Sequence, residues 1–499
     1  MQADPLSIQG PGPGTYVLSA WVYLRAMGLI YMAAFVSLGM QIKGLVGQRG
    51  ILPAGEFLES NRLTKSDRCF ALYPTLCWWN TSDRFLQLLC WGGAVLAAML
   101  VMGVAPVPIL IILWVAYLSL FTVSRVFLGY QWDVLLLEMG FLAIFIAPFD
   151  LAPHWPPRYE PWNAVRWLHY WLLFRLMFAS GVVKLRSGDA TWRSLTALQF
   201  HYETQPLPNR VSWYVHQLPS WFHKMSAVLM FAIELGLPFL IFAPPPFRYV
   251  AAWGIIVLML LIMITGNYCF FNLQGLALCA LLFDDAAWNT IFHIPIAYWR
   301  AVVISSVPMN WPIVIIILVQ LLILILSADR MLRLFRIKFE WPAQVEKILA
   351  ATQPFGLVNN YGLFAVMTTE RPEIIVEGSR DGVNWLPYEF KWKAEDVKRA
   401  PGICIPHQPR LDWQMWFAAL GGSRVAPWFD HFRTRLLEGS PEVLALLKKN
   451  PFPDQPPRFV RAVYYDYRFT DKETRLRSGD WWKRERRGLY SPETSHHSR

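Results

Sequence analysis

The chain has 499 residues, of which 55% are hydrophobic and only 16% are charged. A soluble globular domain has about a quarter of its residues charged, so this composition points to a membrane protein. The formal net charge of +11 indicates loops beside anionic headgroups, and no basic run with interleaved aromatic residues supports a nucleic-acid partner.

Apolar runs recur along the first two thirds of the chain. A membrane span needs roughly 20 mostly apolar residues. The N-terminal residues before the first run have no basic stretch, so we expect that run to direct insertion instead of a cleaved signal peptide. Lysine and arginine occur in loops that cannot all share one side, which leaves the orientation open. The sequence predicts about nine spans, near 16–41, 84–104, 106–128, 132–149, 162–184, 221–243, 247–266, 268–283 and 310–328.

The composition changes after the last span. Residues 330–349 alternate basic and apolar side chains at helical spacing, which suits a helix on the headgroups or a plain connector. From residue 350 onward, short runs rich in β-branched and aromatic residues predict a mainly β domain. The predicted organisation is therefore a multi-pass helical membrane domain (1–329), a connector helix (330–349) and a mainly β C-terminal domain (350–499).

Local signals place four elements in this C-terminal domain. Asp381-Gly382 between two strand-like runs predicts a hairpin. The stretch "LDWQMWFAALGG" predicts a helix that stops at glycine. Ser440 as N-cap before Pro441 predicts a second, short helix, and "RFVRAVYYDYRFT" predicts a strand.

Charged residues inside the apolar runs are costly if they face lipid, by roughly 2.5–3.5 kcal/mol for Asp, Lys or Arg at a helix centre. We expect Asp133 near water at a span end, with Arg125 as its partner. Glu138 lies about 7.5 Å deeper and is expected to pair with Arg175. These charged residues either form structural ion pairs between helices or line a polar cavity that handles a substrate or proton. The residues concerned are Arg25, Arg125, Asp133, Glu138, Arg175, Lys184 and Glu234.

Other polar groups give weaker signals. Small polar side chains at 267–274 are expected to bond across helices, with a ligand contact as the alternative. His201, Glu203, His216 and His223 lack the spacing of a metal site. Cys69 and Cys77 share a loop, as a disulfide or as two free thiols. No catalytic motif occurs, so we predict no catalytic residue, no metal ligand and no cofactor.

Seven long strings resemble the lipase maturation factor family, and they run in order across nearly the whole chain. The membrane half is also distantly similar to the membrane region of vitamin K-dependent gamma-carboxylase. The strings are "GLIYMAAFVSLGMQIKGLVGQRGILPA", "QWDVLLLEMGFLAIF", "SLTALQFHYETQPLPN", "NYCFFNLQGLALCALLFDD", "YGLFAVMTTERPEIIVEGS", "RLDWQMWFAALG" and "YDYRFTDKETRLRSGDWWKRERRGLYSP".

The resemblance implies a multi-pass protein of the endoplasmic reticulum membrane that assists folding and assembly of a secreted lipase, its client. A bacterial source would imply the inner membrane and a different client. Aromatic residues are frequent contact residues, so a client site is expected in the C-terminal domain, with core packing as the alternative. The candidates are Trp385, Tyr388, Trp392, Trp413 and Trp416.

Two other functions are compatible with the residues alone. A membrane-embedded enzyme or redox factor would use the buried charges or a cysteine. A transporter is less supported, because neither an internal repeat nor paired broken helices is evident. An open cavity around Glu138, Arg175 and Glu234 would favour an enzyme, whereas closed and fully paired charges would favour a scaffold.

Overall fold

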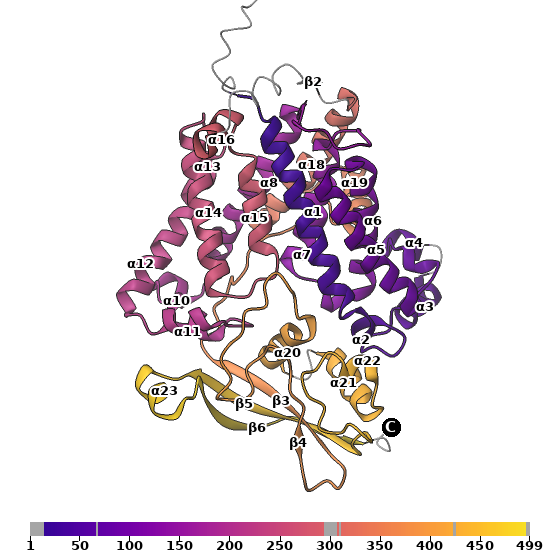
Figure 1. Ribbon diagram of the computed structural model, residues 1–499, viewed down its shortest axis with the longest axis vertical. Helices are drawn as coiled ribbons and strands as arrows, with labels where there is room; N and C mark the ends of the chain where they lie inside the picture. The colour runs from indigo at the N-terminus through magenta and orange to yellow at the C-terminus, as the bar shows by residue number, and fades with distance from the viewer. Residues whose placement is uncertain (1–13, 66–67, 294–306, 309–310, 423–425, 496–499) are drawn as a thin grey trace, which may run out of the picture.

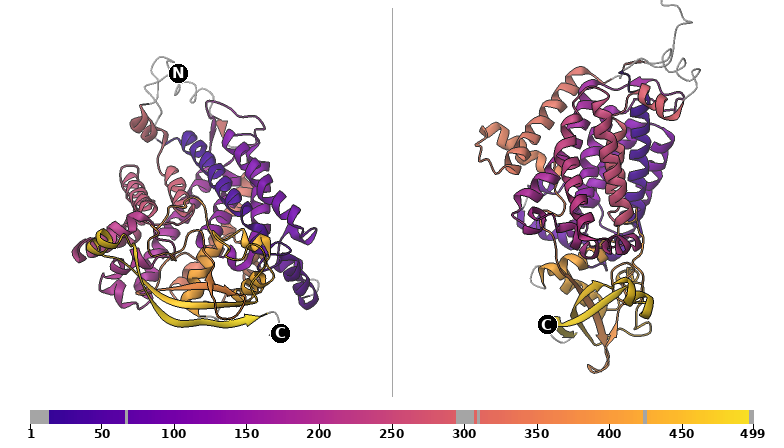
Figure 2. Two further views of the ribbon diagram at one scale, coloured as in Figure 1. Left: turned by 60° about the horizontal axis from the view of Figure 1, so that its bottom comes forward. Right: turned by 90° about the vertical axis from the view of Figure 1, so that its left-hand side faces the viewer.

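The computed structural model describes residues 14–65, 68–293, 307–308, 311–422 and 426–495. A bundle of long helices stands above a smaller domain built on an antiparallel sheet (Figure 1). Figure 2 shows from two further sides that the sheet lies across one end of the bundle. This arrangement confirms the predicted class, a polytopic helical membrane protein with a C-terminal sheet domain.

Within the described residues, seven helical segments are long and apolar enough to cross a membrane, and each coincides with a predicted span. The fifth joins two helices through a π-helical turn, η4 (Ala232–Gly236). The segments are α1 (Val17–Gly39), α5 (Asp83–Met102), α6 (Pro106–Ser124) with η3 (Arg125–Phe127), α8 (Asn163–Arg186), α12 (Ser220–Phe231) with α13 (Leu237–Leu240), α14 (Phe247–Thr265) and α18 (Ile313–Leu334).

The two remaining predicted runs are helical but shorter. α7 (Gln131–Ile146) has 16 residues and lies inside the bundle, where nearly all its side chains are buried. Such burial explains its lack of a polar face. α15 (Phe271–Ala280) meets α16 (Asp285–Phe292) at a bend of 108°. The number of membrane crossings therefore stays a prediction.

Local sequence explains where the helices begin and end. The hydroxyl of Ser82 accepts a hydrogen bond from Phe85 N at the start of α5, and Gly103 ends that helix with φ of +87°. Short elements connect the long helices. They are α2 (Ile42–Val46), α3 (Ala54–Lys65), α4 (Cys69–Leu72), η2 (Leu76–Trp78), α9 (Ala190–Arg193), α10 (Ala197–Thr204), α11 (Arg210–His216) and the parallel strands β1 (Tyr159–Glu160) and β2 (Val307–Pro308).

The stretch predicted as a connector helix contains two helical parts. α18 continues to Leu334, and α19 (Ala343–Thr352) begins after Pro342 and leads to η5 (Gln353–Phe355). Proline is favoured just before or at a helix start because it cannot continue an earlier helix. The chain then passes alongside the bundle before it enters the C-terminal domain.

The C-terminal sheet has the strand order β4-β3-β5-β6, and every pair is antiparallel. The predicted hairpin is confirmed: Gly382 has φ of +77°, and the Asp381 carboxylate accepts bonds from Val383 N and Asn384 N. The predicted strand is confirmed as β5. The strands are β3 (Arg371–Ser379), β4 (Leu386–Pro387), β5 (Phe459–Phe469) and β6 (Trp482–Ser495).

Helices cover the side of the sheet that faces the bundle. α20 (Arg410–Gly421) is the predicted "LDWQMWFAALGG" helix, and it contacts both β3 and η3 (Figure 1). α21 (Pro427–Leu437) and α22 (Pro441–Leu444) follow, and α23 (Lys472–Ser478) joins β5 to β6. Ser440 precedes α22 as predicted. Its hydroxyl donates to Arg49 O of the membrane half and accepts no hydrogen bond from the backbone N–H groups of the first turn of α22.

Candidate functional site

Asp133 lies at the junction between the bundle and the C-terminal domain. Its two carboxylate oxygens accept hydrogen bonds from Arg410 of α20 at 2.5 and 2.8 Å, and Tyr117 donates to it at 2.6 Å. The side chains of Asp133 and Arg410 are fully buried. The prediction that water reaches Asp133 was wrong, because α20 covers this end of α7.

The predicted partner of Asp133 was also wrong. The guanidinium of Arg125 lies over the Phe57 ring, 4.8 Å from its centroid, and the side chain is half-buried. Arg25 has a similar environment, with its guanidinium 4.6 Å from the Trp21 centroid. Cation–π contacts of this kind stabilise a charge beside an aromatic ring without a carboxylate.

Glu138 pairs with Arg175, as the opposite signs of the two side chains predicted. Its second carboxylate oxygen accepts bonds from Tyr361 Oη at 2.7 Å and from Asn359 N at 3.0 Å. Tyr361 and Asn359 belong to the segment between η5 and β3. The ion pair therefore also holds the chain that leads into the C-terminal domain, a role that the sequence did not indicate.

Lys184 and Glu234 form the third buried pair. Lys184 Nζ lies 2.8 Å from each carboxylate oxygen of Glu234, which the π-helical turn η4 carries. π-helical turns are frequent at functional sites. The pair lies in the wall of a mostly apolar cavity of about 240 Å³ between α8, α12 and α14. An apolar cavity with a few converging polar groups is the usual form of a small-molecule site.

The polar groups of this cavity are paired with one another. Lys184 and Glu234 neutralise each other, and His201 in α10 contacts Tyr268 Oη at 3.2 Å. Burial lowers the pKa of His201 to about 4, so its imidazole is neutral at pH 7. Among the described residues of the wall, neither Ser180 nor Ser226 is hydrogen-bonded to a histidine.

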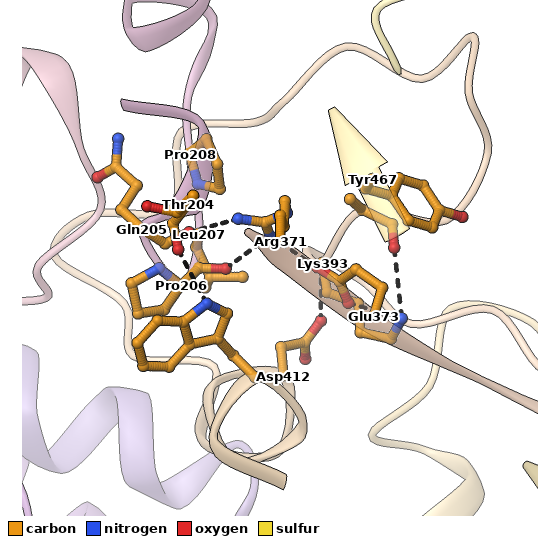
Figure 3. A network of polar contacts seen from close by, with 12 residues as sticks. Thr204, Gln205, Pro206, Leu207, Pro208, Arg371, Glu373, Lys393, Asp412 and Tyr467 are labelled. Carbon is orange, nitrogen blue, oxygen red and sulfur yellow. Dashed lines mark hydrogen bonds and ion pairs between the residues drawn. The ribbon is translucent and has the colours of Figure 1, made fainter. Parts of the chain in front are cut away.

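Arg371 at the start of β3 holds the loop 204–208 of the membrane half (Figure 3). Its guanidinium donates to the carbonyl oxygens of Glu203, Gln205 and Pro206 at 2.6–3.0 Å. It also donates to the Glu373 carboxylate at 2.7 Å. Trp416 Nε1 donates to Thr204 O at 2.9 Å. Buried charges paired and hydrogen-bonded in this way are costly to separate.

The polar residues at the start of α15 belong to the same junction. Asn267 donates to Gly402 O at 2.9 Å and accepts from Cys404 N at 2.9 Å. Glu203 accepts from Phe469 N at 3.0 Å and lies 3.7 Å from His216. The expected bonding across elements therefore occurs for Asn267, whose partners lie in the C-terminal domain, and for Gln274, which donates to Trp132 O of α7. The Asn272 amide has no hydrogen-bond partner among the described residues.

Burial corrects three of the five candidate client contacts. The side chains of Tyr388, Trp413 and Trp416 are 1%, 3% and 6% exposed, so they do not form a contact surface in this structure. Trp413 packs against Tyr130 and Trp132 of the membrane half. These aromatic residues fill the core and the junction, which is the alternative that the sequence had left open.

The other two candidates remain half-buried. The Trp385 ring lies under the Arg461 guanidinium, 4.0 Å from its centroid. Trp392 lies near His407. Both present part of a ring to solvent, so a contact role for them stays a prediction.

The six cysteines are buried free thiols, so Cys69 and Cys77 do not form a disulfide here. Burial raises the pKa of Cys77 to about 11 and raises the pKa of Cys404 as well. A thiolate is the reactive form of cysteine, so both groups are poor nucleophiles at neutral pH. Within the described ranges, no three His, Cys, Asp or Glu side chains are placed to hold a metal ion.

The residues that sequence reasoning missed are Arg371, Arg410, Asn359 and Tyr361. Each belongs to the C-terminal part of the chain, and each bonds to the membrane half. One arginine, tyrosine or asparagine in a soluble domain gives no sequence signal of a partner that is distant along the chain. These pairs could be assigned only from the three-dimensional structure.

The chain is similar to known proteins along nearly its whole length. It matches the family models described as lipase maturation factor transmembrane domain, over residues 18–290, and lipase maturation factor C-terminal domain, over residues 357–492. It is 36% identical to lipase maturation factor 2 of Gallus gallus, over 95% of this chain and 81% of that protein.

Two human relatives show similar sequence identity and coverage. Lipase maturation factor 2 of Homo sapiens is 35% identical, over 93% of this chain and 81% of the relative. Lipase maturation factor 1 of Homo sapiens is 32% identical, over 97% and 88%. No solved structure matches the chain.

Removal of either carboxylate of α7 should destabilise the protein strongly. In Asp133→Ala and Glu138→Ala, a buried guanidinium loses its counter-ion, which costs about 3–5 kcal/mol. We expect both variants to show a much lower Tm in detergent.

The matched control is Glu473→Ala, whose side chain is 86% exposed in a surface ion pair. We expect its Tm to stay close to that of the unmodified protein. A Tm for Asp133→Ala that equals the control would contradict the buried pair with Arg410.

The stability of the C-terminal domain should depend on pH through Glu395. Burial raises its pKa from 4.5 to about 7, although Lys393 at 3.3 Å opposes the shift. Between these values the folded state binds a proton that the unfolded state has lost, so this contribution to stability is full at low pH and declines as the pH rises to about 7.

Glu395→Gln should remove that contribution, because glutamine does not titrate and can still accept from Phe390 N. The free energy of unfolding of both proteins at about pH 5 and about pH 8 checks this. We expect a smaller decline in the variant. An equal decline in both proteins would refute the assignment.

Proposed function

The chain belongs to the lipase maturation factor family, and from this premise we propose that it is a membrane-anchored maturation factor that assists folding and assembly of a secreted lipase without catalysing a reaction. The observation that carries the proposal is the coverage of the match: 32–36% identity over 93–97% of this chain, with both halves included. A chain that had kept only the membrane anchor would not support a client role.

The buried charges support a scaffold. The carboxylates of Asp133, Glu138 and Glu234 are each paired with a cation. Two of these carboxylates also bond groups from the C-terminal part of the chain. Charges used in this way position a domain, and they are not free to transfer protons to a substrate.

The surface that we propose for the client is the hairpin between β3 and β4. It forms the end of the molecule farthest from the helical bundle (Figure 1). Val383 and Leu386 are 78% and 47% exposed, and Trp385 between them is half-buried. A partly folded secreted protein exposes apolar segments that such side chains can contact.

Family membership and the apolar helices agree with the endoplasmic reticulum membrane as the site of action, with the C-terminal domain on the luminal side. Secreted lipases fold in that compartment, so a client and this domain would meet there. A bacterial source would place the same arrangement in the inner membrane.

Co-expression tests the proposed function. A candidate lipase is secreted from cells that lack endogenous maturation factors, with and without this chain, and its activity per mass of secreted enzyme is measured. We expect higher specific activity with the chain. Equal specific activity for every lipase tested would overturn the proposal for that class of client.

Charge on the hairpin tests the client surface. Val383→Asp with Leu386→Asp should weaken client capture by about tenfold or more, because apolar hot-spot residues contribute about 2 kcal/mol or more. Leu476→Asp on α23, where the leucine is 87% exposed, is the control. If control and hairpin variants capture the client equally, the client surface lies elsewhere.

A further inference from the structure

A second cavity, of about 440 Å³, lies where α8 and α18 end, against the segment 359–366. Its described wall includes five arginines and no aspartate or glutamate. They are Arg175, Arg186, Arg330, Arg333 and Arg336. This cavity is separate from the apolar cavity beside Lys184 and Glu234, and the proposed function does not use it.

The charge balance around the cavity is positive. Behind the wall, Glu138 pairs with Arg175, and Asp329 lies 2.8 Å from Arg333 and 3.7 Å from Arg330. Two carboxylates therefore face five guanidinium groups, which do not lose their protons in proteins. Arg186 donates to the carbonyl oxygen of Leu334 and lies 5.8 Å from the centroid of the Phe335 ring, and no carboxylate among the described residues pairs with it.

The arginines of the wall have donors left for a ligand, and Arg175 and Arg336 illustrate this. The Arg175 side chain is 2% exposed, and its Nε has no hydrogen-bond partner among the described residues. Buried donors are nearly always matched by an acceptor, which an anionic oxygen in the cavity would supply. The Arg336 guanidinium is exposed and takes part in no contact among the described residues.

The backbone at Arg336 adds an independent observation. Arg336 follows the last turn of α18 with φ of +56°, and Ile337 N donates to Leu332 O. Glycine is the usual residue in this left-handed position at a helix end, because other residues are strained there. Arg336 occupies this strained position, and its side chain forms part of the cavity wall.

The location indicates the source of the ligand. α8 and α18 are both candidate membrane spans, and both end at this cavity, so it lies at the level of the lipid headgroups. Exposed apolar side chains follow directly at Phe335, Ile337 and Phe339. Inorganic phosphate has no apolar part that could contact these side chains, whereas the acyl chains of a lipid would contact them.

We propose that this cavity binds the phosphate of an anionic phospholipid from the surrounding leaflet. Guanidinium groups bind phosphate oxygens in pairs of parallel hydrogen bonds. Basic pockets between membrane helices are suited to anionic headgroups. The lipid would rest against Asn360 and Tyr361, next to the segment that leads into the C-terminal domain.

The test uses the full-length protein in detergent and compares phosphatidylglycerol, phosphatidylcholine and inorganic phosphate as ligands. Bound lipid is counted by native mass spectrometry, and the Tm is measured in parallel. We expect phosphatidylglycerol to bind and raise the Tm, phosphatidylcholine to bind at least about tenfold more weakly, and inorganic phosphate to do neither at similar concentration.

Arg330→Gln with Arg336→Gln should weaken phosphatidylglycerol binding by about tenfold or more, since bonds to charged groups are lost. The control is Arg468→Gln with Arg477→Gln, which removes the same charge from exposed sites on the C-terminal domain. We expect the control to bind lipid normally. Arg336 is exposed and Arg330 is 27% exposed. A normal Tm without lipid shows that the variant folds.

Three results would overturn the proposal. Equal binding of phosphatidylcholine would show that charge is not recognised. An equal loss in the control variant would show general attraction to a basic protein. Binding of inorganic phosphate as tight as that of phosphatidylglycerol would show a soluble ligand and not a lipid.

Discussion

A charge that is buried in a membrane protein must meet an opposite charge or hydrogen-bonding groups, and this requirement places the C-terminal domain. α7 carries two fully buried carboxylates, Asp133 and Glu138. Arg410 of α20 forms an ion pair with Asp133. Arg175 forms an ion pair with Glu138, which also accepts hydrogen bonds from Tyr361 and Asn359. The buried carboxylates of α7 therefore have all these partners only when the later part of the chain is in position.

This dependence connects the fold to the proposed function. A domain held by buried ion pairs keeps one position relative to the bilayer, so the hairpin of β3 and β4 stays at a set distance from the membrane. The same pairs engage the carboxylates of Asp133 and Glu138 in holding the later part of the chain. Arg371 adds a second attachment at the 204–208 loop, which is far from Asp133 in sequence (Figure 3).

The sequence predicted the features that depend on residues close together in the chain. Apolar length identified the long helices, Asp381-Gly382 identified the hairpin, and the signs of Glu138 and Arg175 identified one ion pair. It failed where the partner is remote. Arg410 is 277 residues from Asp133, and no local pattern joins them. The sequence left the exposure of the tryptophans open, because an aromatic residue that contacts a partner and one that packs in a core look alike in sequence.

The central claim is that Asp133 and Arg410 stabilise the structure together. A double-mutant cycle with Asp133→Ala, Arg410→Ala and both, followed by the free energy of unfolding in detergent, measures this coupling directly. The account predicts that the double variant loses less stability than the sum of the single variants, by about 1–3 kcal/mol. Additive losses would contradict it.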